Sequence, residues 1–393
     1  MATSPGHVAV LGAGPVGLDA ALAATDAGLS VTVYEAGAAV GAHVRAWGHV
    51  RLFTPWRLNA SARMRTHLAG AGRDLPEDAA YPTGTELADH LLGPLAGLPA
   101  LAGRVRLGHR VAAVARASLL KHEHIGSSTR AAAPFRLLVD GPDGEYEDHA
   151  GLVLDCTGTY ATPNSLGDGG IAARGERALA HRITRTLPPL TAEPDRWAGT
   201  VLLVGAGKSA QTAARGLAEL PGTRLEWLVR SPDPDWGEVP DDSLPERQRL
   251  VDVSRDLAAG GHERVTVRTG ARVTALAPDA GGRVRAAVST ATGPHEIVAD
   301  HVVALTGYAA DSALYRQLQV HECYATGAPM NVSAALLGSA GGDCLAQPAV
   351  GLETLRNPEP GFYILGAKSY GRLNTFLLRG GYAQVDEVAA AWA

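Results

Sequence analysis

Apolar residues and glycines repeat one local pattern twice along the chain. In the first copy, the apolar run 8–11 is followed by a glycine turn and by a segment of helical length. Pro15 suits the first turn of a helix and Gly28 suits its end, so we predict a strand at 7–11, a helix over 15–27 and a strand at 31–35. The second copy starts at Thr200, with a strand to Gly205, a helix and a strand at 224–230.

The rest of the chain continues this alternation. Thr83 and Glu86 form a capping box for a helix that reaches Leu95. Further strands are predicted at 104–114, 151–155, 264–268, 271–276, 283–290, 297–305 and 361–365, and further helices over 245–259 and up to Trp392. Segments 117–134 and 231–244 are predicted loops, the second a candidate lid over a nucleotide site. The expected fold class is α/β, with two Rossmann-like domains.

At 393 residues the chain is long for one hydrophobic core, so we expect two domains. A proline-rich crossing before residue 193 suggests the first boundary. The expected division is a first domain over 1–192, a second over 193–310 and a closing segment over 311–393.

The three glycines of the first turn each serve a separate purpose. Gly12 allows the tight turn, Gly14 lets the backbone approach a pyrophosphate, and Gly17 lets helix and strand pack closely. Glu35 ends the next strand, near the ~20-residue spacing at which a carboxylate reaches a ribose hydroxyl. Since this acid would repel a 2′-phosphate, the turn is predicted to hold the AMP half of FAD or NAD.

The second turn predicts a different nucleotide. Gly205, Gly207 and Ala210 follow the same pattern, and Lys208 and Ser209 add a cation and a hydroxyl at the helix start. The next strand ends in Arg230 rather than in an acid, which predicts a 2′-phosphate and therefore NADPH. The alternative is that Arg230 is an ordinary solvated surface charge.

Several residues outside the two turns are candidates for cofactor contacts. Trp47 and Trp56, interleaved with arginines that include Arg45, would form a wall of a flavin pocket or a packing cluster of the core. The backbone of Val111 would contact an adenine or simply belong to an inward-facing strand. Two strands end in Thr-Gly, where backbone can lie against a cofactor; the residues are Thr157, Gly158, Thr306 and Gly307.

Composition narrows the classes of partner and compartment. A net charge of -5 without a long basic run argues against nucleic acid, and no long uncharged apolar stretch suggests a membrane span. We expect a cytoplasmic protein that acts on a small molecule, and a homo-oligomer is compatible with the sequence. Three cysteines exclude a disulfide framework; Cys323 and Cys344 could form a redox pair or stand as unpaired thiols, and no metal site is expected.

With both glycine turns and both Thr-Gly strand ends in this order, the whole chain resembles the flavoproteins with two dinucleotide-binding domains, especially class B flavin monooxygenases and N-hydroxylating flavin monooxygenases. The resemblance implies a discontinuous FAD domain to which the C-terminal segment returns, with Gly366, Phe376 and Leu377 near the flavin. It implies bound FAD, reduction by NADPH, and reaction with O₂ to a flavin C4a-hydroperoxide that oxygenates nitrogen or sulfur. Candidates for the substrate pocket beside the expected flavin are Trp47, Trp56, Asn59, Lys368, Tyr370 and Arg372.

The chain also departs from this family. His181 lies six residues after Gly175, so the F-x-G-x-x-x-H fingerprint of the monooxygenases does not fit, and Gly366-Ala367-Lys368 stands where many relatives have Gly-Asp. The C-x-x-C of thioredoxin-reductase relatives is absent. The alternatives are therefore an NADPH-dependent flavin reductase that passes electrons to a quinone, disulfide or protein, and a non-catalytic protein that keeps the fold.

Overall fold

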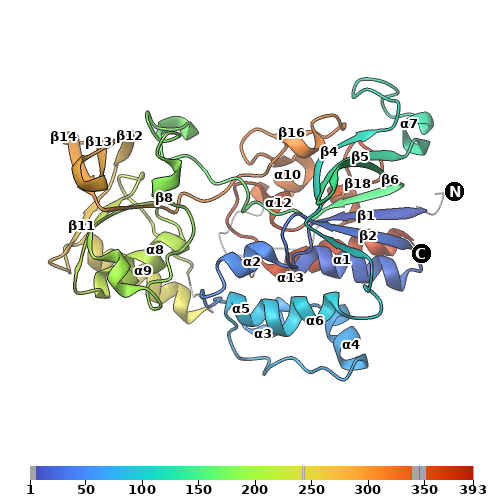
Figure 1. Cartoon of the computed structure of the whole chain (residues 1–393), viewed down its shortest axis with the longest axis horizontal. Coiled ribbons are helices and arrows are strands. Elements are labelled where there is room, and N and C mark those ends of the chain that lie inside the picture. Colours follow the sequence, from blue (N-terminus) through green and yellow to red (C-terminus); the bar gives the residue numbers. More distant parts are fainter. Residues whose placement is uncertain (1–5, 241, 243, 339–344, 346–350, 393) are drawn as a thin grey trace. The chain divides into compact units, whose positions relative to one another are not determined.

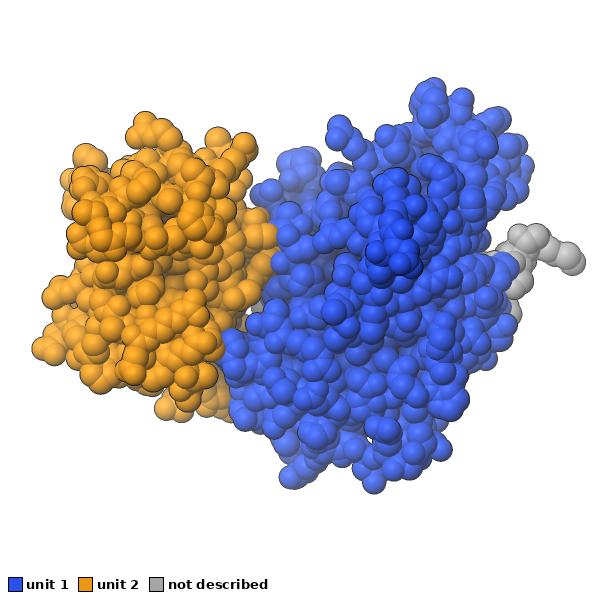
Figure 2. All heavy atoms as spheres, viewed as in Figure 1, with its two compact units in different colours: residues 1–162, 309–393 blue, residues 163–308 orange. Residues whose placement is uncertain are grey.

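The computed structural model describes residues 6–240, 242, 244–338, 345 and 351–392. The chain divides into two compact units, which are coloured separately in Figure 2. Unit 1 consists of residues 1–162 and 309–393, and unit 2 consists of residues 163–308. Unit 2 is therefore an insertion into unit 1. Among the described residues, no helix has the length and apolar character needed to cross a membrane.

Unit 1 is built on a parallel five-stranded sheet in the order β18-β7-β1-β2-β3. Its strands are β1 (His7–Leu11), β2 (Ser30–Glu35), β3 (Val105–Leu107), β7 (Leu152–Asp155) and β18 (Phe362–Ile364). The strand β18 comes from the segment after unit 2, so the C-terminal part of the chain completes the sheet of unit 1. This agrees with the discontinuous first domain that the resemblance implies.

The two faces of this sheet are covered by different layers (Figure 1). Val8 and Val10 pack in one core with the helices, among which are α1 (Pro15–Asp26) and α13 (Leu378–Ala389). Ala9 and Leu11 point the other way and pack in a second core with an antiparallel sheet of β4 (Arg110–Arg116), β5 (Phe135–Gly141) and β6 (Gly144–Ala150). The alternation along β1 thus sends successive side chains into opposite cores.

The smaller elements of unit 1 complete the helical layer and the loops. They are α2 (Ala42–Ala46), α3 (Trp56–Asn59), α4 (Ala62–Gly70), α5 (Gly84–Leu87), the π-helical turn η1 (Ala88–Leu92), α6 (Gly93–Ala96), α7 (Ser128–Ala132), η6 (Ala313–Tyr315), the hairpin β16 (Glu322–Cys323) and β17 (Ala328–Pro329), α10 (Met330–Gly338), α11 (Leu352–Leu355), α12 (Ala367–Tyr370) and η7 (Ala390–Trp392). The predicted capping box is confirmed, because Thr83 and Glu86 exchange both of its hydrogen bonds at the start of α5.

Unit 2 repeats the strand order of unit 1. Its parallel sheet has the order β11-β10-β9-β15-β8. The strands are β8 (Ile183–Thr184), β9 (Gly199–Val204), β10 (Thr223–Leu228), β11 (Val265–Arg268) and β15 (His301–Ala304). Reading from the strand before each glycine turn, β9 corresponds to β1, β10 to β2 and β15 to β7. The fifth strand of each sheet has a different position in the sequence. In unit 1, β18 follows the inserted unit 2, whereas in unit 2, β8 precedes β9.

The layers of unit 2 also match those of unit 1 (Figure 1). The helices α8 (Lys208–Glu219) and α9 (Pro245–Ala258) share a core with Val201 and Leu203 of β9, whereas Leu202 faces the antiparallel sheet of β12 (Arg272–Pro278), β13 (Val284–Thr290) and β14 (Gly293–Ala299). Short 3₁₀ turns are η2 (Asp168–Gly170), η3 (Ala180–Arg182), η4 (Pro194–Trp197) and η5 (Ala280–Gly282). The expected α/β class with two Rossmann-like domains is confirmed.

Three boundaries differ from the sequence-based prediction. Unit 2 begins at Pro163 rather than at residue 193, because the preceding segment contains β8, which pairs with β15. The predicted strand over 104–114 is divided into β3 and β4, since Gly108 adopts a left-handed φ of 71° between them. The predicted strand over 297–305 is divided at Asp300, whose carboxylate accepts a hydrogen bond from the backbone of Thr200.

One buried carboxylate joins three helices of unit 1. Asp19 of α1 is fully buried, accepts a hydrogen bond from the Ser61 hydroxyl and lies 3.0 Å from the Arg63 guanidinium of α4. Arg63 also contacts Asp386 of α13 at 2.7 Å. Burial raises the pKa of Asp19 to about 6, although Arg63 and Ser61 act in the opposite direction.

This raised pKa predicts an unusual pH dependence of stability. Because the ionised form of Asp19 is disfavoured in the folded state, its protonation stabilises the fold as pH falls below 6. The free energy of unfolding of the wild type, relative to Asp19→Asn, should increase by about 1.4 kcal/mol per pH unit between pH 6 and 4. Urea unfolding at several pH values measures this difference. A constant difference between the two proteins over this pH range would contradict the prediction.

Candidate functional site

In the first glycine turn of unit 1, the fold requires two of the glycines and does not require the third. A Cβ on Gly12 would lie 2.8 Å from the Cys156 carbonyl oxygen, and one on Gly17 would lie 1.9 Å from the Gly12 carbonyl oxygen. A Cβ on Gly14 would meet no protein atom within 4 Å, and Gly14 has an ordinary φ of -80°. The protein's own packing therefore leaves space at Gly14, as a cradle for a ligand would.

Gly14 is also the N-cap of α1 and makes no side-chain cap. The first-turn amides of a helix have no acceptor within the helix and attract phosphate oxygens. Pro15, the first helical residue, lacks an N–H at a position where none is needed. The open space and the free helix end fit the pyrophosphate of a dinucleotide.

Glu35 lies where the sequence places it, at the carboxyl end of β2. Its side chain is buried, and its two oxygens accept hydrogen bonds at 2.8 Å from the backbone N–H groups of Ala13 and Gly37. The carboxylate is thus held against the glycine turn itself. This arrangement fits recognition of a ribose hydroxyl beside the turn, and it places a negative charge where a 2′-phosphate would be unfavourable.

The Thr-Gly end of β7 is held by a buried ion pair. Asp155 accepts hydrogen bonds from the backbone and the hydroxyl of Thr157, at 3.1 and 2.6 Å. The ammonium of Lys368 lies 2.7 Å from Asp155 and donates to the Thr157 hydroxyl at 3.1 Å. Lys368 is 1% exposed, so this candidate for the substrate pocket instead orients the exposed Thr157 and the following Gly158.

Gly366 is the N-cap of α12, the short helix that carries Lys368. Its backbone N–H donates to Gln384 of α13 at 2.8 Å, and its left-handed φ of 71° brings it against Val16 of α1. The end of β18 is therefore joined both to the start of α1 and to the C-terminal helix. Gly366 lies at the same sheet edge as the glycine turn, since parallel strands end together.

The second glycine turn has the same arrangement in unit 2. A Cβ on Gly205 would lie 2.2 Å from the Leu305 carbonyl oxygen, whereas one on Gly207 would meet nothing within 4 Å. Gly207 is the N-cap of α8, with a φ of -69°. Ala210 is fully buried in the helical core, and Ser209 is exposed at the start of the helix. The second turn thus also offers a free helix end and an open backbone.

Lys208 does not point freely into this space. Its ammonium donates to the Trp236 carbonyl oxygen at 2.9 Å and lies 3.3 Å from the Gln211 side chain, which donates to the same carbonyl at 2.9 Å. The indole of Trp236 packs on that of Trp227, with ring centres 5.1 Å apart. Burial, with a contribution from Arg247, lowers the pKa of Lys208. The described part of the predicted lid, segment 231–244, is therefore attached to the start of α8 through Trp236.

Arg230 follows β10 and is exposed. Within the described part of the chain its guanidinium makes no hydrogen bond or ion pair, whereas Arg268 at the end of the neighbouring β11 is paired with Glu226. An arginine without a protein partner at the end of the second strand fits a phosphate supplied by a ligand better than a structural role.

The Thr-Gly end of β15 is fixed by Asn164. The Thr306 hydroxyl donates to the Asn164 carbonyl oxygen at 2.8 Å, and the Asn164 side chain donates to the Thr306 carbonyl oxygen at 3.1 Å. Gly307 follows with a left-handed φ of 81° and is exposed. Both Thr-Gly ends thus lie beside the glycine turn of their own unit.

The aromatic candidates of unit 1 differ in their surroundings. Trp56 is 2% exposed in the helical core, and Asn59 is 1% exposed, with its side-chain amide bonded to the backbone of Thr54 and Pro55. These placements favour the packing alternative for Trp56. Trp47 is only partly buried and lies with its ring centre 6.3 Å from that of the exposed Tyr160, so it remains a candidate for contact with a ligand.

The remaining candidates are spread over unit 1. Tyr370 is 5% exposed, and its ring packs edge-on against Phe376 with centres 5.2 Å apart. Arg372 is exposed, and Leu377 caps α13. Arg45 contacts Asp89 at 2.7 Å, and Val111 is half-buried in β4.

Cysteine chemistry is limited in the described residues. Cys156 lies behind the first glycine turn, where burial raises the pKa of its thiol well above the usual value. Hydrogen bonds from the backbone and side chain of Thr326, among others, lower the pKa of the Cys323 thiol. Neither forms a disulfide, and Cys344 lies outside the described residues. No group of His, Cys, Asp and Glu among the described residues could hold a metal ion.

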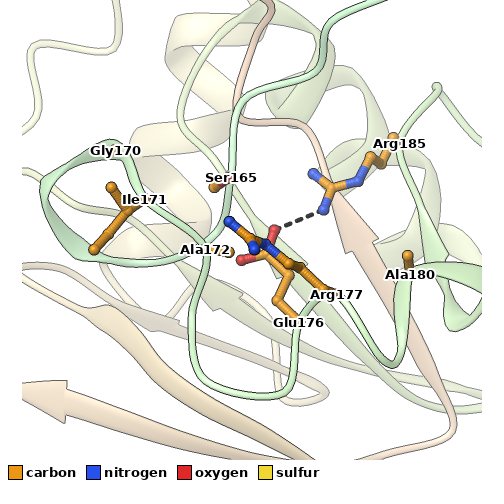
Figure 3. Close-up of a pocket in the computed structure, with 8 residues that line it drawn as sticks. All are labelled: Ser165, Gly170, Ile171, Ala172, Glu176, Arg177, Ala180 and Arg185. Atoms are coloured by element: carbon orange, nitrogen blue, oxygen red, sulfur yellow. Dashed lines mark hydrogen bonds and ion pairs between the residues drawn. The ribbon is translucent and has the colours of Figure 1, made fainter.

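The sequence analysis did not identify two groups of residues at these sheet edges. Gln211 and Trp236 join the loop to α8, and Glu176, which precedes β8, forms an ion pair at 2.6 Å with Arg185, which follows β8 (Figure 3). Gln211 lies one helical turn after Gly207, a spacing that could have indicated its position. Glu176 and Arg185 follow no local pattern, because β8 is only two residues long.

No family model matches the chain, and no curated protein sequence matches it significantly. Solved structures with a similar fold cover nearly its whole length. A bacillithiol disulfide reductase from Bacillus cereus superposes with a TM-score of 0.69 and 18% identity, covering 98% of each chain. An ornithine N-hydroxylase from a Kutzneria species, whose structure contains reduced FAD, NADP⁺ and L-ornithine, has a TM-score of 0.63 and 18% identity over 99% of each chain.

A third similar structure is the cadaverine monooxygenase of desferrioxamine biosynthesis from Erwinia amylovora, bound to FAD. It has a TM-score of 0.64 and 14% identity, and the match covers 99% of this chain and 94% of that one. At these identities the similarity establishes the fold alone. The fold is that of flavoproteins with two dinucleotide-binding domains, as expected from the order of the glycine turns.

The open backbone at Gly14 allows ligand binding to be tested separately from folding. Gly14→Ala should change the free energy of unfolding by less than about 1 kcal/mol, since neither space nor φ is restricted. It should weaken FAD binding about tenfold or more by placing a methyl group against the pyrophosphate. Gly17→Ala should instead destabilise the fold by about 3 kcal/mol because of its clash with Gly12. Thermal unfolding and flavin absorbance distinguish the two; equal flavin binding by Gly14→Ala would contradict the assignment.

Proposed function

We propose that the protein is an FAD- and NADPH-dependent oxidoreductase, and that it is a monooxygenase acting on a nitrogen or sulfur atom of a small metabolite. The observation that carries the proposal is the presence of two open glycine turns, one followed by Glu35 and the other by Arg230. An acid suits the ribose of FAD, and an unpaired arginine suits the 2′-phosphate of NADPH. Two dinucleotide sites in one chain support transfer of electrons from one nucleotide to the other.

The chain's own residues supply binding and orientation. In unit 1, Gly14 and the first-turn amides of α1 would hold the FAD pyrophosphate, and Glu35 would bind its ribose. Thr157, which Asp155 and Lys368 hold in place, would lie against the cofactor at the end of β7. In unit 2, Gly207 and the start of α8 would hold the NADPH pyrophosphate, with Arg230 at the 2′-phosphate. When bound, FAD supplies the redox chemistry, including the activation of O₂.

Oxygen insertion is favoured over disulfide reduction by the cysteines. Disulfide reduction through a protein thiol begins with attack by an accessible thiolate, and a second thiol of the same protein, as in C-x-x-C, helps to resolve the mixed disulfide. The thiol of Cys156 is buried with a raised pKa, and no C-x-x-C occurs in the chain. Two similar structures are named as an N-hydroxylase and a monooxygenase of amines, which supports nitrogen as the oxygenated atom.

The second candidate function is that of a reductase, because a bacillithiol disulfide reductase has a similar fold. In that case the protein would pass electrons from NADPH through FAD to a quinone, disulfide or protein acceptor without inserting oxygen. The lowered pKa of the Cys323 thiol is the observation within this chain that favours thiol chemistry. Both functions share the same cofactors and differ in the fate of the electrons.

Arg230 provides a test of the second nucleotide. Arg230→Gln should raise the KM for NADPH about 10- to 100-fold through loss of charge-assisted hydrogen bonds to the 2′-phosphate, and should leave the KM for NADH nearly unchanged. The control Arg224→Gln removes an exposed arginine from β10, the strand that precedes Arg230, and should alter neither value. An equal rise in the KM values for NADPH and NADH would mean that Arg230 does not contact the 2′-phosphate.

The fate of oxygen separates the two functions. The purified FAD-loaded protein is supplied with NADPH, ¹⁸O₂ and a panel of amines, amino acids and thiols. The monooxygenase proposal expects substrate-stimulated NADPH oxidation and a product that carries one ¹⁸O atom, detected by mass spectrometry. NADPH oxidation that requires a quinone or disulfide, with no labelled product, would assign the reductase function instead. Purified protein without flavin would exclude both.

A further inference from the structure

The indole of Trp47 in unit 1 carries a buried donor that the fold itself does not use. The side chain as a whole is only partly buried, but its Nε1 atom is shielded from solvent and finds no hydrogen-bond acceptor among the described residues. A buried indole N–H ordinarily has a partner, because it otherwise loses its contact with water without compensation. The function proposed above assigns no role to this donor.

A glycine of α5 fixes the orientation of the indole. A Cβ on Gly84 would lie 2.7 Å from both Cε3 and Cζ3 of Trp47, so the benzene part of the indole packs directly on the backbone. These two carbons lie on the side of the ring system opposite to Nε1. The capping box of Thr83 and Glu86 holds the start of α5 in place. The N–H group is therefore held on the side of the ring that faces away from Gly84.

The aromatic neighbours of Trp47 place it beside the end of β7. The ring centre of Tyr160 lies 6.3 Å from that of Trp47 and 6.0 Å from that of His43. Tyr160 comes shortly after Thr157 and Gly158, the strand end that lies beside the first glycine turn. The buried donor and the proposed FAD site therefore belong to the same edge of the sheet, and all of these residues belong to unit 1.

The strand order of unit 1 indicates which half of FAD would meet Trp47. The strand β2, which ends in Glu35, and the strand β7 lie on opposite sides of β1. With the pyrophosphate at the turn after β1 and the adenosine ribose at Glu35, the flavin half would extend toward β7. Neighbouring strands are about 5 Å apart, so this half would reach the end of β7, where Tyr160 and Trp47 lie.

We propose that the Trp47 indole N–H donates a hydrogen bond to the isoalloxazine ring of bound FAD. This rests on the proposed function and deepens it, because it identifies a residue that regulates the redox property of the cofactor. The acceptors of the ring are its carbonyl oxygens and unprotonated nitrogens, which become more electron-rich on reduction. A donor at this position stabilises reduced flavin more than oxidised flavin, and so raises the midpoint potential.

The variant Trp47→Phe tests the proposal, since it keeps an aromatic ring on Gly84 and removes only the donor part of the indole. In the full-length, FAD-loaded protein, the midpoint potential of the flavin should become more negative, and its visible absorption bands should shift. The dissociation constant for FAD should rise about threefold to tenfold, as expected for one lost hydrogen bond. Titration against reference dyes measures the potential, and the fluorescence of released flavin measures the affinity.

The matched control is Trp197→Phe, which removes another buried indole N–H that has no acceptor among the described residues, in the core of unit 2. This variant should leave both values as in the wild type. An unchanged or more positive potential in Trp47→Phe overturns the proposal even if FAD binds more weakly, because loss of packing would then explain the weaker binding.

The same measurements separate this proposal from the proposed function. Wild-type protein that cannot be loaded with FAD would overturn both. A flavin whose potential becomes more negative in Trp47→Phe, in a protein that inserts no ¹⁸O, would support the hydrogen bond and exclude only the monooxygenase function.

Discussion

The structure depends on one close approach that occurs once in each unit. The first glycine of the turn presses against the backbone carbonyl that ends the neighbouring parallel strand, Cys156 for Gly12 and Leu305 for Gly205. A side chain on either glycine would separate these strands. The contact places three features at one sheet edge: the helix start, the Thr-Gly strand end and the residue that ends the second strand. The candidate cofactor contacts at the glycine turns, at the Thr-Gly ends, and at Glu35 and Arg230 follow from this placement.

Given the shared framework, the difference between the units lies in a few side chains. The carboxylate of Glu35 is turned inward onto the backbone of its own glycine turn, whereas Arg230 is exposed and unpaired within the described chain. The fifth strands differ in origin but end in comparable ways. Lys368 follows β18 and pairs with Asp155, and Arg185 follows β8 and pairs with Glu176. An ion pair therefore supports the edge of each sheet, fully buried in unit 1 and partly buried in unit 2.

Much of this framework could be predicted, since the two strand–turn–helix units are local in sequence and carry their own signals. Glycine positions and helix starts were therefore predictable, as was the acid or arginine at the strand end. The roles of Lys368 and Trp56 were not, because burial depends on residues distant in sequence. Lys368 looks like a free cation until Asp155 is placed beside it. The two-residue β8 gives no periodic signal, so the boundary of unit 2 and the Glu176–Arg185 ion pair could only come from the structure.

The two crossings between the units meet side by side. The Ala309 N–H donates to the Thr162 carbonyl oxygen at 2.9 Å, and Pro163 forms a bridge with Tyr308. An inserted module whose entry and exit coincide can gain, lose or exchange residues without altering the path of its host. Each unit is thus free to diverge on its own, because substitutions within unit 2 need not alter the sheet of unit 1.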